Sequence, residues 1–266
     1  EVQLMDEGNG AKAEEVLRLS GITKRFGNLT ANNAISLTLA RGEVVALLGE
    51  NGAGKTTLMN ILFGHYTADE GSVEVFGQAL PPGQPGAALA AGVGMAHQHF
   101  TLADNMTVLE NVLLGTGSLW SPGLGKPAAR RKLQELAQDF GLRVDPDARV
   151  AELSVGERQR VEILKALWRD ANVLILDEPT AVLTPQEAVE LGEVLRRMVA
   201  EGRSVIFISH KLDEVVSLCD EATVLRGGAT VAASLPVVDV DTSELAKLMV
   251  GDVAVEPVPV AVAMPG

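Results

Sequence analysis

The sequence has little cysteine and no long apolar runs. The first excludes an internal disulfide, and the second argues against a membrane span. Its one cysteine, Cys219, has no second cysteine with which to form an internal disulfide, which agrees with a reducing compartment. No run reaches the roughly 18 apolar residues that a membrane span needs. The first residues also lack the basic patch and apolar stretch of a secretory signal. We therefore expect a soluble, intracellular protein.

Basic residues are also in short supply. Lys and Arg total 22 against 35 Asp and Glu, which gives a formal net charge of −13. Such a charge argues against the phosphate backbone of a nucleic acid as the main partner. An anionic ligand would need a local site that overcomes the unfavourable overall field. With 47% hydrophobic residues, the chain has the composition of a globular protein.

Short apolar runs alternate with helical patterns along most of the chain. The predicted strands are 16–19, 35–39, 44–48, 72–76 (as an edge strand), 173–176 and 205–208, and a Gly227-Gly228 turn predicts a hairpin. The predicted helices begin near residues 55, 107, 130, 155, 185 and 211. This alternation predicts an α/β fold with a mainly parallel sheet covered by helices on both faces. We expect residues 1–14 to be a flexible tail and 251–266 a linker or truncated end.

A glycine-rich loop follows the apolar run 44–48. Residues 49–56 read GENGAGKT and fit the pattern G-x-x-x-x-G-K-[ST], between a predicted strand and a predicted helix. The glycines allow backbone angles at which successive N–H groups converge on phosphate oxygens, and the helix N-terminus attracts the same anion. We expect Lys55 to bridge the β- and γ-phosphates and Thr56 to bind Mg²⁺. The expected nucleotide contacts are Gly49, Glu50, Asn51, Gly52, Ala53, Gly54, Lys55, Thr56 and Thr57.

Two acidic residues end the apolar run 173–176. Carboxylates at the carboxyl end of a buried strand lie beside the ligand crevice of an open α/β sheet. Asp177 is therefore the expected partner of Mg²⁺, and Glu178 the expected general base for the attacking water. Taken alone, such a pair would more simply be two solvated acids at a strand end.

The segment 153–160, LSVGERQR, precedes this acidic strand. Ser154 and Glu157 have the spacing of a capping box, which places the Ser154 hydroxyl and the Gly156 N–H at a helix N-terminus. The segment resembles the LSGGQ signature of the ABC ATPases. Without the other motifs, an ordinary capped helix would be the simpler interpretation.

The resemblance to the ABC ATPases covers about residues 15–250. It implies a P-loop NTPase core with a mainly parallel sheet, an antiparallel β subdomain and an inserted helical subdomain at about 100–170. It also implies that Phe26 stacks on adenine, that Gln98 contacts Mg²⁺ and water, and that His210 contacts the γ-phosphate. Ser154 and Gly156 would close over the ATP of a facing ABC ATPase domain in a head-to-tail dimer.

Three further sequence segments indicate a subgroup within the ABC ATPases. The segments ENGAGKTT, TVLENV and DEPTAVLTPQE look like the first ATPase domain of tandem importer ATPases for simple sugars and nucleosides. This implies an integral membrane permease as partner, a place on the cytoplasmic face of the membrane, and no nucleic acid. Three residues depart from the family pattern: Thr184 replaces a usual Asp, Val155 a usual Gly and Glu157 a usual Gln.

Two other functions stay open, and these departures favour only the first of them. One is a nucleotide-gated ABC domain with little turnover of its own. The other is a soluble ABC ATPase that acts on nucleic acid or ribosomes, against which the net charge of −13 counts.

Overall fold

The computed structural model describes residues 14–96, 101–114 and 125–251. Its larger sheet has six strands in the order β10-β9-β3-β8-β7-β6. Strands β3, β6, β7, β8 and β9 run parallel to one another, and β10 pairs antiparallel with β9. The strands are β3 (Val44–Leu48), β6 (Val93–Ala96), β7 (Val173–Asp177), β8 (Ser204–Ile208), β9 (Glu221–Arg226) and β10 (Ala229–Pro236).

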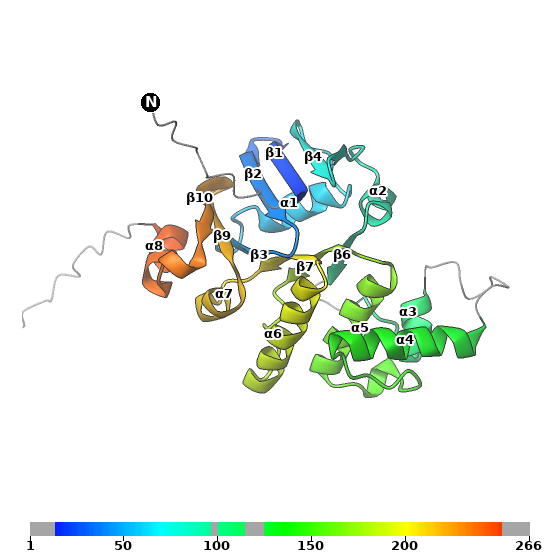
Figure 1. The fold of residues 1–266 in the computed structure, drawn as a ribbon. Helices are drawn as coiled ribbons and strands as arrows, with labels where there is room; N and C mark the ends of the chain where they lie inside the picture. The colour runs from blue at the N-terminus through cyan, green and yellow to red at the C-terminus, as the bar shows by residue number, and fades with distance from the viewer. Residues whose placement is uncertain (1–13, 97–100, 115–124, 252–266) are drawn as a thin grey trace, which may run out of the picture.

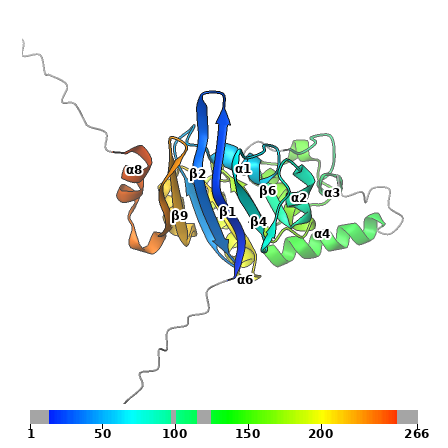
Figure 2. The same cartoon turned by 90° about the horizontal axis from the view of Figure 1, so that it is seen from above.

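A second, antiparallel sheet has the order β2-β1-β4-β5. Its strands are β1 (Glu15–Phe26), β2 (Leu29–Ala40), β4 (Glu70–Val75) and β5 (Gln78–Ala79). The hairpin of β1 and β2 extends beyond the rest of the molecule (Figure 2). The prediction of an edge strand at 72–76 is wrong in one respect, because β5 pairs with the end of β4 and takes the outer position.

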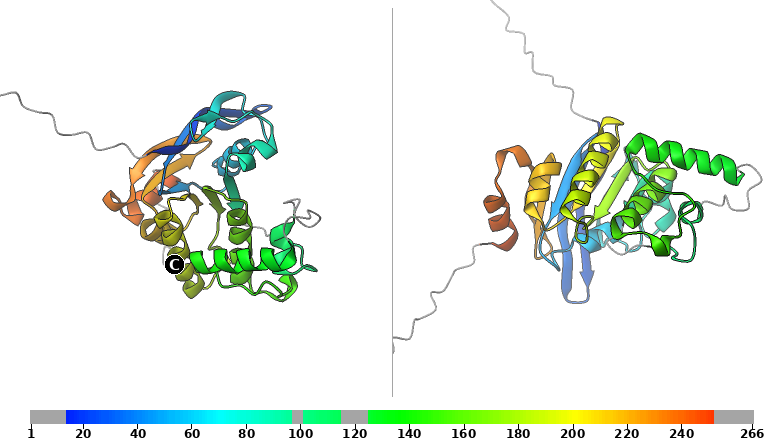
Figure 3. Two further views of the ribbon diagram at one scale, coloured as in Figure 1. Left: turned by 45° about the vertical axis from the view of Figure 1, so that its right-hand side comes forward. Right: turned by 90° about the horizontal axis from the view of Figure 1, so that it is seen from below.

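Helices surround the larger sheet. Two of them, α1 (Lys55–Leu62) and α2 (Pro85–Ala90), lie on the side of the antiparallel sheet (Figure 1). The others are α3 (Val108–Leu113), α4 (Lys126–Phe140), α5 (Val155–Trp168), α6 (Pro185–Ala200), α7 (Leu212–Leu218) and α8 (Thr242–Val250), with short 3-10 turns at Val150–Glu152 and Val237–Asp239. Seen from below, α6 lies between α4 and α8 (Figure 3). None of the helices in the described ranges is both long and apolar enough to cross a membrane.

The larger sheet separates two apolar cores. In β3, Val45 and Leu47 pack with β1, β2 and α1, while Val44, Ala46 and Leu48 pack with the helices of the other face. Because successive side chains of a strand point to opposite faces, a strand covered on both sides must be apolar at every position. All five residues of β3 and all five of β8 are accordingly buried. Cys219 is buried as well.

Phe207 should show how much this packing contributes to stability. It lies in the middle of β8 with no exposed surface, so Phe207→Ala removes a large side chain and leaves a cavity. We expect the free energy of unfolding to fall by about 3–5 kcal/mol. Val189→Ala on the outer face of α6, where Val189 is 65% exposed, should change it by less than about 0.5 kcal/mol. Urea unfolding followed by circular dichroism measures both, and equal losses would contradict this account of the core.

Candidate functional site

The glycine-rich loop 49–54 connects β3 to α1. Gly49 and Gly54 have φ of 153° and 103°, and the Ala53 N–H donates to the Glu50 carbonyl at 3.1 Å. A Cβ at Gly49 would lie 2.5 Å from the Leu225 carbonyl oxygen, so the loop also packs closely against β9. Positive φ and close backbone approach are both conditions that favour glycine. The backbone therefore forms the tight turn that the pattern predicts at this position.

Two segments distant in the sequence brace this loop. The Asn32 Nδ2 donates to the Gly54 carbonyl at 3.0 Å, and the Gly228 N–H donates to the Ala53 carbonyl at 3.2 Å. Asn33 in turn donates its N–H to the Gly228 carbonyl at 2.7 Å. No sequence pattern predicted that Asn32 or Gly228 contacts the loop, although Asn32 is completely buried.

Lys55 begins α1 directly after the loop. Its Nζ donates to the Gly49 carbonyl at 2.5 Å and to the Glu50 carbonyl at 3.1 Å. Burial lowers the pKa of the Lys55 ammonium, and the negative charges of Glu178 and Asp177 oppose that shift. The lysine and the two acids therefore lie close enough to interact electrostatically, on the same side of the sheet.

The sheet register explains this proximity. Strand β8 lies between β3 and β7, with Ile208 aligned to Leu47 on one side and to Asp177 on the other. Because the three strands are parallel, their carboxyl ends meet at one edge. The residues that follow them, in the phosphate loop, at Glu178 and at His210, are thereby brought together.

Glu178 adopts an uncommon backbone conformation at this edge. Its φ is +49°, a region that non-glycine residues rarely occupy, and its N–H donates to the Ile208 carbonyl at 2.9 Å. His210 Nδ1 lies 2.9 Å from both carboxylate oxygens and forms its hydrogen bond with Oε1. Oε2 is buried and has no hydrogen-bond partner within the described residues. The histidine ring nitrogen thus lies equally close to both oxygens of the Glu178 carboxylate.

A small polar network fixes the segment after Glu178. The Lys211 Nζ donates to the Thr180 carbonyl at 2.8 Å and pairs with Glu214 at 3.2 Å, while the Thr180 hydroxyl donates to Glu214. Thr180 is buried, so its hydroxyl needs such an acceptor. These contacts join the chain after β7 to the chain after β8 and so limit the movement of Glu178 relative to His210. The sequence did not predict this network of Lys211, Thr180 and Glu214.

Phe26 stands at the end of β1, and its side chain is 44% exposed. Tyr66 meets it edge to face, with ring centroids 5.5 Å apart, and the Lys24 Nζ lies 5.5 Å from the Phe26 centroid. The face of an aromatic ring attracts a cation, and an exposed ring can also stack on a base. The sequence analysis gave Tyr66 no role, since a single tyrosine carries no pattern.

The predicted capping box at the start of α5 is present. The Glu157 N–H donates to the Ser154 hydroxyl at 3.2 Å, and the Ser154 N–H donates to the Glu157 carboxylate at 2.8 Å. Thr184 caps α6 in the same way with Glu187, whose carboxylate accepts from the Thr184 N–H and hydroxyl at 2.9 Å. These bonds lower the pKa of Glu187.

The two capped helices touch each other at Gly156. A Cβ on Gly156 would lie 2.2 Å from Glu187 Oε1, so this carboxylate packs against the bare glycine backbone. Ser154 and Gly156 therefore lie beside the start of α6. Gln98 lies outside the described residues.

The described residues hold no group of three or more His, Cys, Asp or Glu side chains that could enclose a metal ion. Of the predicted Mg²⁺ ligands, the described residues include Thr56, in the first turn of α1, and Asp177, at the end of β7. Mg²⁺ commonly uses one or two protein oxygens together with water and phosphate oxygens rather than an all-protein cage. This small donor set fits Mg²⁺ bound together with a phosphorylated ligand.

A buried strand, a glycine loop that opens a helix, and an acid-tipped strand two positions along the same sheet define a nucleotide-binding protein of the phosphate-loop class.

Comparisons with known proteins identify the family within this class. A model of the family described as ABC transporter matches residues 32–181. The nucleoside import ATP-binding protein NupA of Lactococcus lactis subsp. cremoris (strain MG1363) is 48% identical over 238 residues, 90% of this chain and 47% of that protein. The ribose import ATP-binding protein RbsA 1 of Burkholderia thailandensis (strain ATCC 700388 / DSM 13276 / CCUG 48851 / CIP 106301 / E264) is 46% identical over 241 residues, 90% of this chain and 47% of that protein.

Among solved structures, the ADP conformation of MJ1267, an ATP-binding cassette of an ABC transporter, superposes with a TM-score of 0.74. Its sequence identity is 30%, and the match covers 82% of this chain and 90% of that one. The chain therefore belongs to the ABC transporter family, as one of its nucleotide-binding cassettes. It spans about half the length of the curated relatives it matches.

The loop glycines allow a matched test of this geometry. Gly52 and Gly54 both have positive φ, but a Cβ on Gly52 meets open space, whereas one on Gly54 lies 2.5 Å from the Ala31 carbonyl oxygen. We expect Gly52→Ala to cost about 1–2 kcal/mol of unfolding free energy from backbone strain alone. Gly54→Ala should cost about 1–3 kcal/mol more, because a backbone atom must also move. Urea unfolding compares the two, and equal costs would mean that the loop is not braced by β2.

Proposed function

We propose that this chain is the ATP-binding and ATP-hydrolysing part of an ABC importer for simple sugars or nucleosides. The observation that carries the proposal is the meeting of Lys55, Glu178 and His210 at one edge of the sheet. The names of NupA and RbsA 1, which refer to nucleoside and ribose import, support the class of solute.

ATP would bind with its phosphates on the backbone N–H groups of residues 49–57, where α1 begins. Lys55 would then exchange its bonds to the Gly49 and Glu50 carbonyls for bonds to phosphate oxygens. Phe26 would stack on the adenine, and its exposed ring supports that role. Tyr66, at the edge of Phe26, would hold that ring in place.

Thr56 and Asp177, with Gln98 from outside the described residues, would hold Mg²⁺. When bound, Mg²⁺ neutralises negative charge on the phosphate oxygens. Thr56 is exposed at the start of α1, and Asp177 ends β7, whose carboxyl end lies at the same edge of the sheet as that of β3, which supports the assignment.

Glu178 would act as the general base. Because an ionised carboxylate only accepts hydrogen bonds, His210 donates from Nδ1 and fixes the direction of the Glu178 carboxylate. Water then gives a proton to Glu178 while its oxygen bonds to the γ-phosphorus, and the bond to the bridging oxygen of ADP breaks. His210 Nε2 is the nitrogen that remains for contact with the γ-phosphate.

The site would be completed by a second ABC ATPase domain in a head-to-tail dimer. In that arrangement Ser154 and Gly156 of one domain meet the nucleotide of the other, and the capped N-terminus of α5 supplies donors for it. An integral membrane permease, contacted through the segment after Gln98, would receive the motion on the cytoplasmic face of the membrane. The match to about half of each curated relative supports a second ATPase domain in the native polypeptide.

A second candidate is a nucleotide-gated domain with little turnover. It is favoured by Thr184, which replaces the family's usual Asp and uses its hydroxyl and N–H to cap α6. The two candidates share nucleotide binding and differ in the rate of hydrolysis. The net charge of −13 leaves the nucleic-acid alternative without support.

Lys55→Ala tests nucleotide binding. The isolated chain should bind ATP weakly and hydrolyse it slowly, because half of each composite site belongs to a second domain. Lys55→Ala should weaken ATP binding at least about 100-fold, the loss expected for a buried charge-assisted contact to phosphate. Lys126→Ala, which removes a lysine with a 75% exposed side chain, serves as the control and should leave affinity unchanged. Titration with a fluorescent ATP analogue measures both, and retained affinity in Lys55→Ala would mean that the loop is misassigned.

Glu178→Gln tests hydrolysis in the reassembled transporter. The amide keeps the shape of the carboxylate but cannot accept the proton, so steady-state phosphate release should fall about 100- to 10,000-fold while ATP still binds. The exposed Glu201, at the end of α6, provides the control Glu201→Gln with unchanged turnover. An unchanged rate in Glu178→Gln would remove Glu178 from the mechanism. A rate that is already negligible before substitution would favour the nucleotide-gated candidate.

A further inference from the structure

One buried carboxylate, on α5, has no part in the chemistry described above. Glu162 is 3% exposed, and its Oε1 accepts from the Thr101 N–H at 2.6 Å and from the Thr101 hydroxyl at 2.9 Å. The Lys165 Nζ lies 4.0 Å from the other carboxylate oxygen and donates to the same hydroxyl at 3.2 Å. A buried charge is costly unless it is paired and hydrogen-bonded, and both conditions are met here. Glu162 therefore fastens Thr101 to α5.

A second side chain on the same face of α5 holds Asp104. Arg158 precedes Glu162 by four residues, the spacing at which two side chains share one face of a helix. Its Nη1 donates to Asp104 Oδ1 at 3.0 Å, while its Nε and Nη2 donate at 3.3 Å to the carbonyls of Leu153 and Ala151. The Ala151 N–H donates to the Asp104 carbonyl at 3.1 Å. The chain after β6 and the chain that enters α5 are thus held to the same helix.

Helix α3 holds the residue between these two contacts. Asn111 is 1% exposed, and its side chain accepts from the Ala103 N–H at 2.7 Å and donates to the Ala103 carbonyl at 3.0 Å. At the far end of α5, the Arg169 Nη2 donates to the Leu114 carbonyl, just after α3, at 2.9 Å. The segment 101–104, α3 and α5 therefore form one unit joined by polar contacts.

The segment 101–104 comes from the nucleotide edge of the sheet. It follows β6, whose last residue, Ala96, is aligned with Leu176 of β7, directly before Asp177. Gln98, the expected contact to Mg²⁺ and water, belongs to the stretch between β6 and this segment, outside the described residues. The chain therefore passes from the edge where ATP is expected directly to the contacts with α5.

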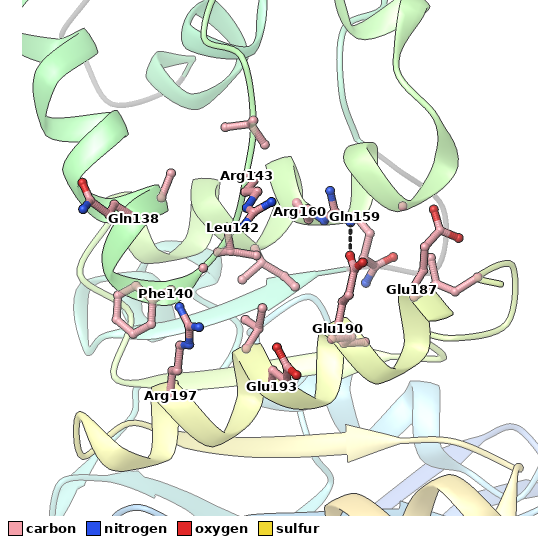
Figure 4. Close-up of a pocket in the computed structure, with 18 of the residues that line it drawn as sticks. Gln138, Phe140, Leu142, Arg143, Gln159, Arg160, Glu187, Glu190, Glu193 and Arg197 are labelled. Carbon is pink, nitrogen blue, oxygen red and sulfur yellow. Dashed lines mark hydrogen bonds and ion pairs between the residues drawn. The ribbon is translucent and has the colours of Figure 1, made fainter. Parts of the chain in front are cut away.

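The same helix carries the signature segment, 153–160. Ser154 caps α5, and Glu162 lies about 12 Å further along the helix at 1.5 Å per residue. On another side, α5 faces α6 across a hollow of about 600 Å³. Figure 4 shows the ion pair between them, with 2.5 Å between Arg160 Nη2 and Glu190 Oε2. Since protein interiors are otherwise closely packed, this volume leaves room for a small shift of α5 relative to α6.

We propose that Glu162 and Arg158 are positioning residues for the signature segment. They hold the segment 101–104 and α5 together, so that a displacement of this segment by bound ATP also displaces Ser154 and Gly156. Both residues act through the signature segment and take no part in the chemical step. The inference rests on the proposed ATP site and deepens it, because it names the contacts through which one site responds to its nucleotide.

Hydrogen exchange in the reassembled transporter tests this link, measured by mass spectrometry with and without a saturating non-hydrolysable ATP analogue. In the unaltered protein the analogue should slow exchange in the signature segment at least about fivefold, the low end of coupling between two sites. Glu162→Leu should remove most of this slowing. Glu162→Gln should keep it, because the amide oxygen still accepts from Thr101. A purely structural role would change exchange equally with and without the analogue.

Steady-state phosphate release provides a second measurement. At saturating ATP, Glu162→Leu should lower kcat about tenfold, the change that loss of one charge-assisted hydrogen bond produces, and Glu162→Gln should restore it. ATP should still bind to both variants, since neither residue belongs to the phosphate loop.

Two exposed carboxylates supply a further variant and its control. Asp104→Ala removes the ion pair with Arg158 at a side chain that is 66% exposed, so it should fold and should reduce the slowing several-fold. Asp147→Ala removes the ion pair with Arg130 of α4 at a side chain that is 57% exposed. Because that pair does not contact the segment 101–104, the slowing should be unchanged. Asp104→Ala decides the matter if Glu162→Leu does not fold.

Several results would overturn the inference and leave the proposed function standing. They are an absence of slowing in the unaltered protein that binds ATP, equal slowing in folded Glu162→Leu or in Asp104→Ala, and loss of slowing in Glu162→Gln or in Asp147→Ala. Failure of the unaltered transporter to bind ATP more tightly than Lys55→Ala is a different result. It would reject the proposed function, and this inference with it.

Discussion

The parallel alignment of β3, β8 and β7 is the constraint on which the site depends. Ile208 is aligned with Leu47 on one side and Asp177 on the other, so the three strands end at the same level. A shift by one residue would turn every side chain of the shifted strand to the opposite face. Such a shift is costly, because both faces of β3 and β8 are packed into separate cores. Packing far from the site therefore fixes the distance between lysine, carboxylate and histidine.

Four backbone carbonyl groups of the phosphate loop accept hydrogen bonds in the structure described. Lys55 donates to two loop carbonyls, while Asn32 and Gly228 donate to two others. A phosphate therefore competes with bonds from Lys55 that already exist, and the lysine needs only to turn to reach it. The overall negative charge makes such a local cationic group necessary, since the field of the protein repels the ligand from a distance.

Much of this arrangement could be predicted from the sequence. The runs 44–48, 173–176 and 205–208 are apolar at every position, which is typical of strands covered on both faces, and each forms a strand. Ser154 with Glu157 predicts the helix start that forms. Thr184 with Glu187 has the same spacing and forms the same capping box at the start of α6.

Other features could not be predicted because they depend on tertiary contacts. Strand β6 has only four residues and one glycine, and it forms because β7 offers it an edge. Asn32 and Gly228 brace the loop from segments that no local pattern links to it. Tyr66 reaches Phe26 only because the chain after α1 returns to the end of β1. The short helices α2 and α8 lack a long apolar period and were also missed.

The position of β3 in the sequence means that it is synthesised well before the strands that pair with it. This strand is made early, but its two neighbours in the sheet begin only at Ser204 and Glu221. At ribosomal speeds of about 5–20 residues per second, its apolar edges stay unpaired for on the order of 10 s. Unpaired apolar strands associate with other chains, and pairings between distant segments form slowly. An unpaired β3 is therefore open to association with other chains until β8 and β9 have been made.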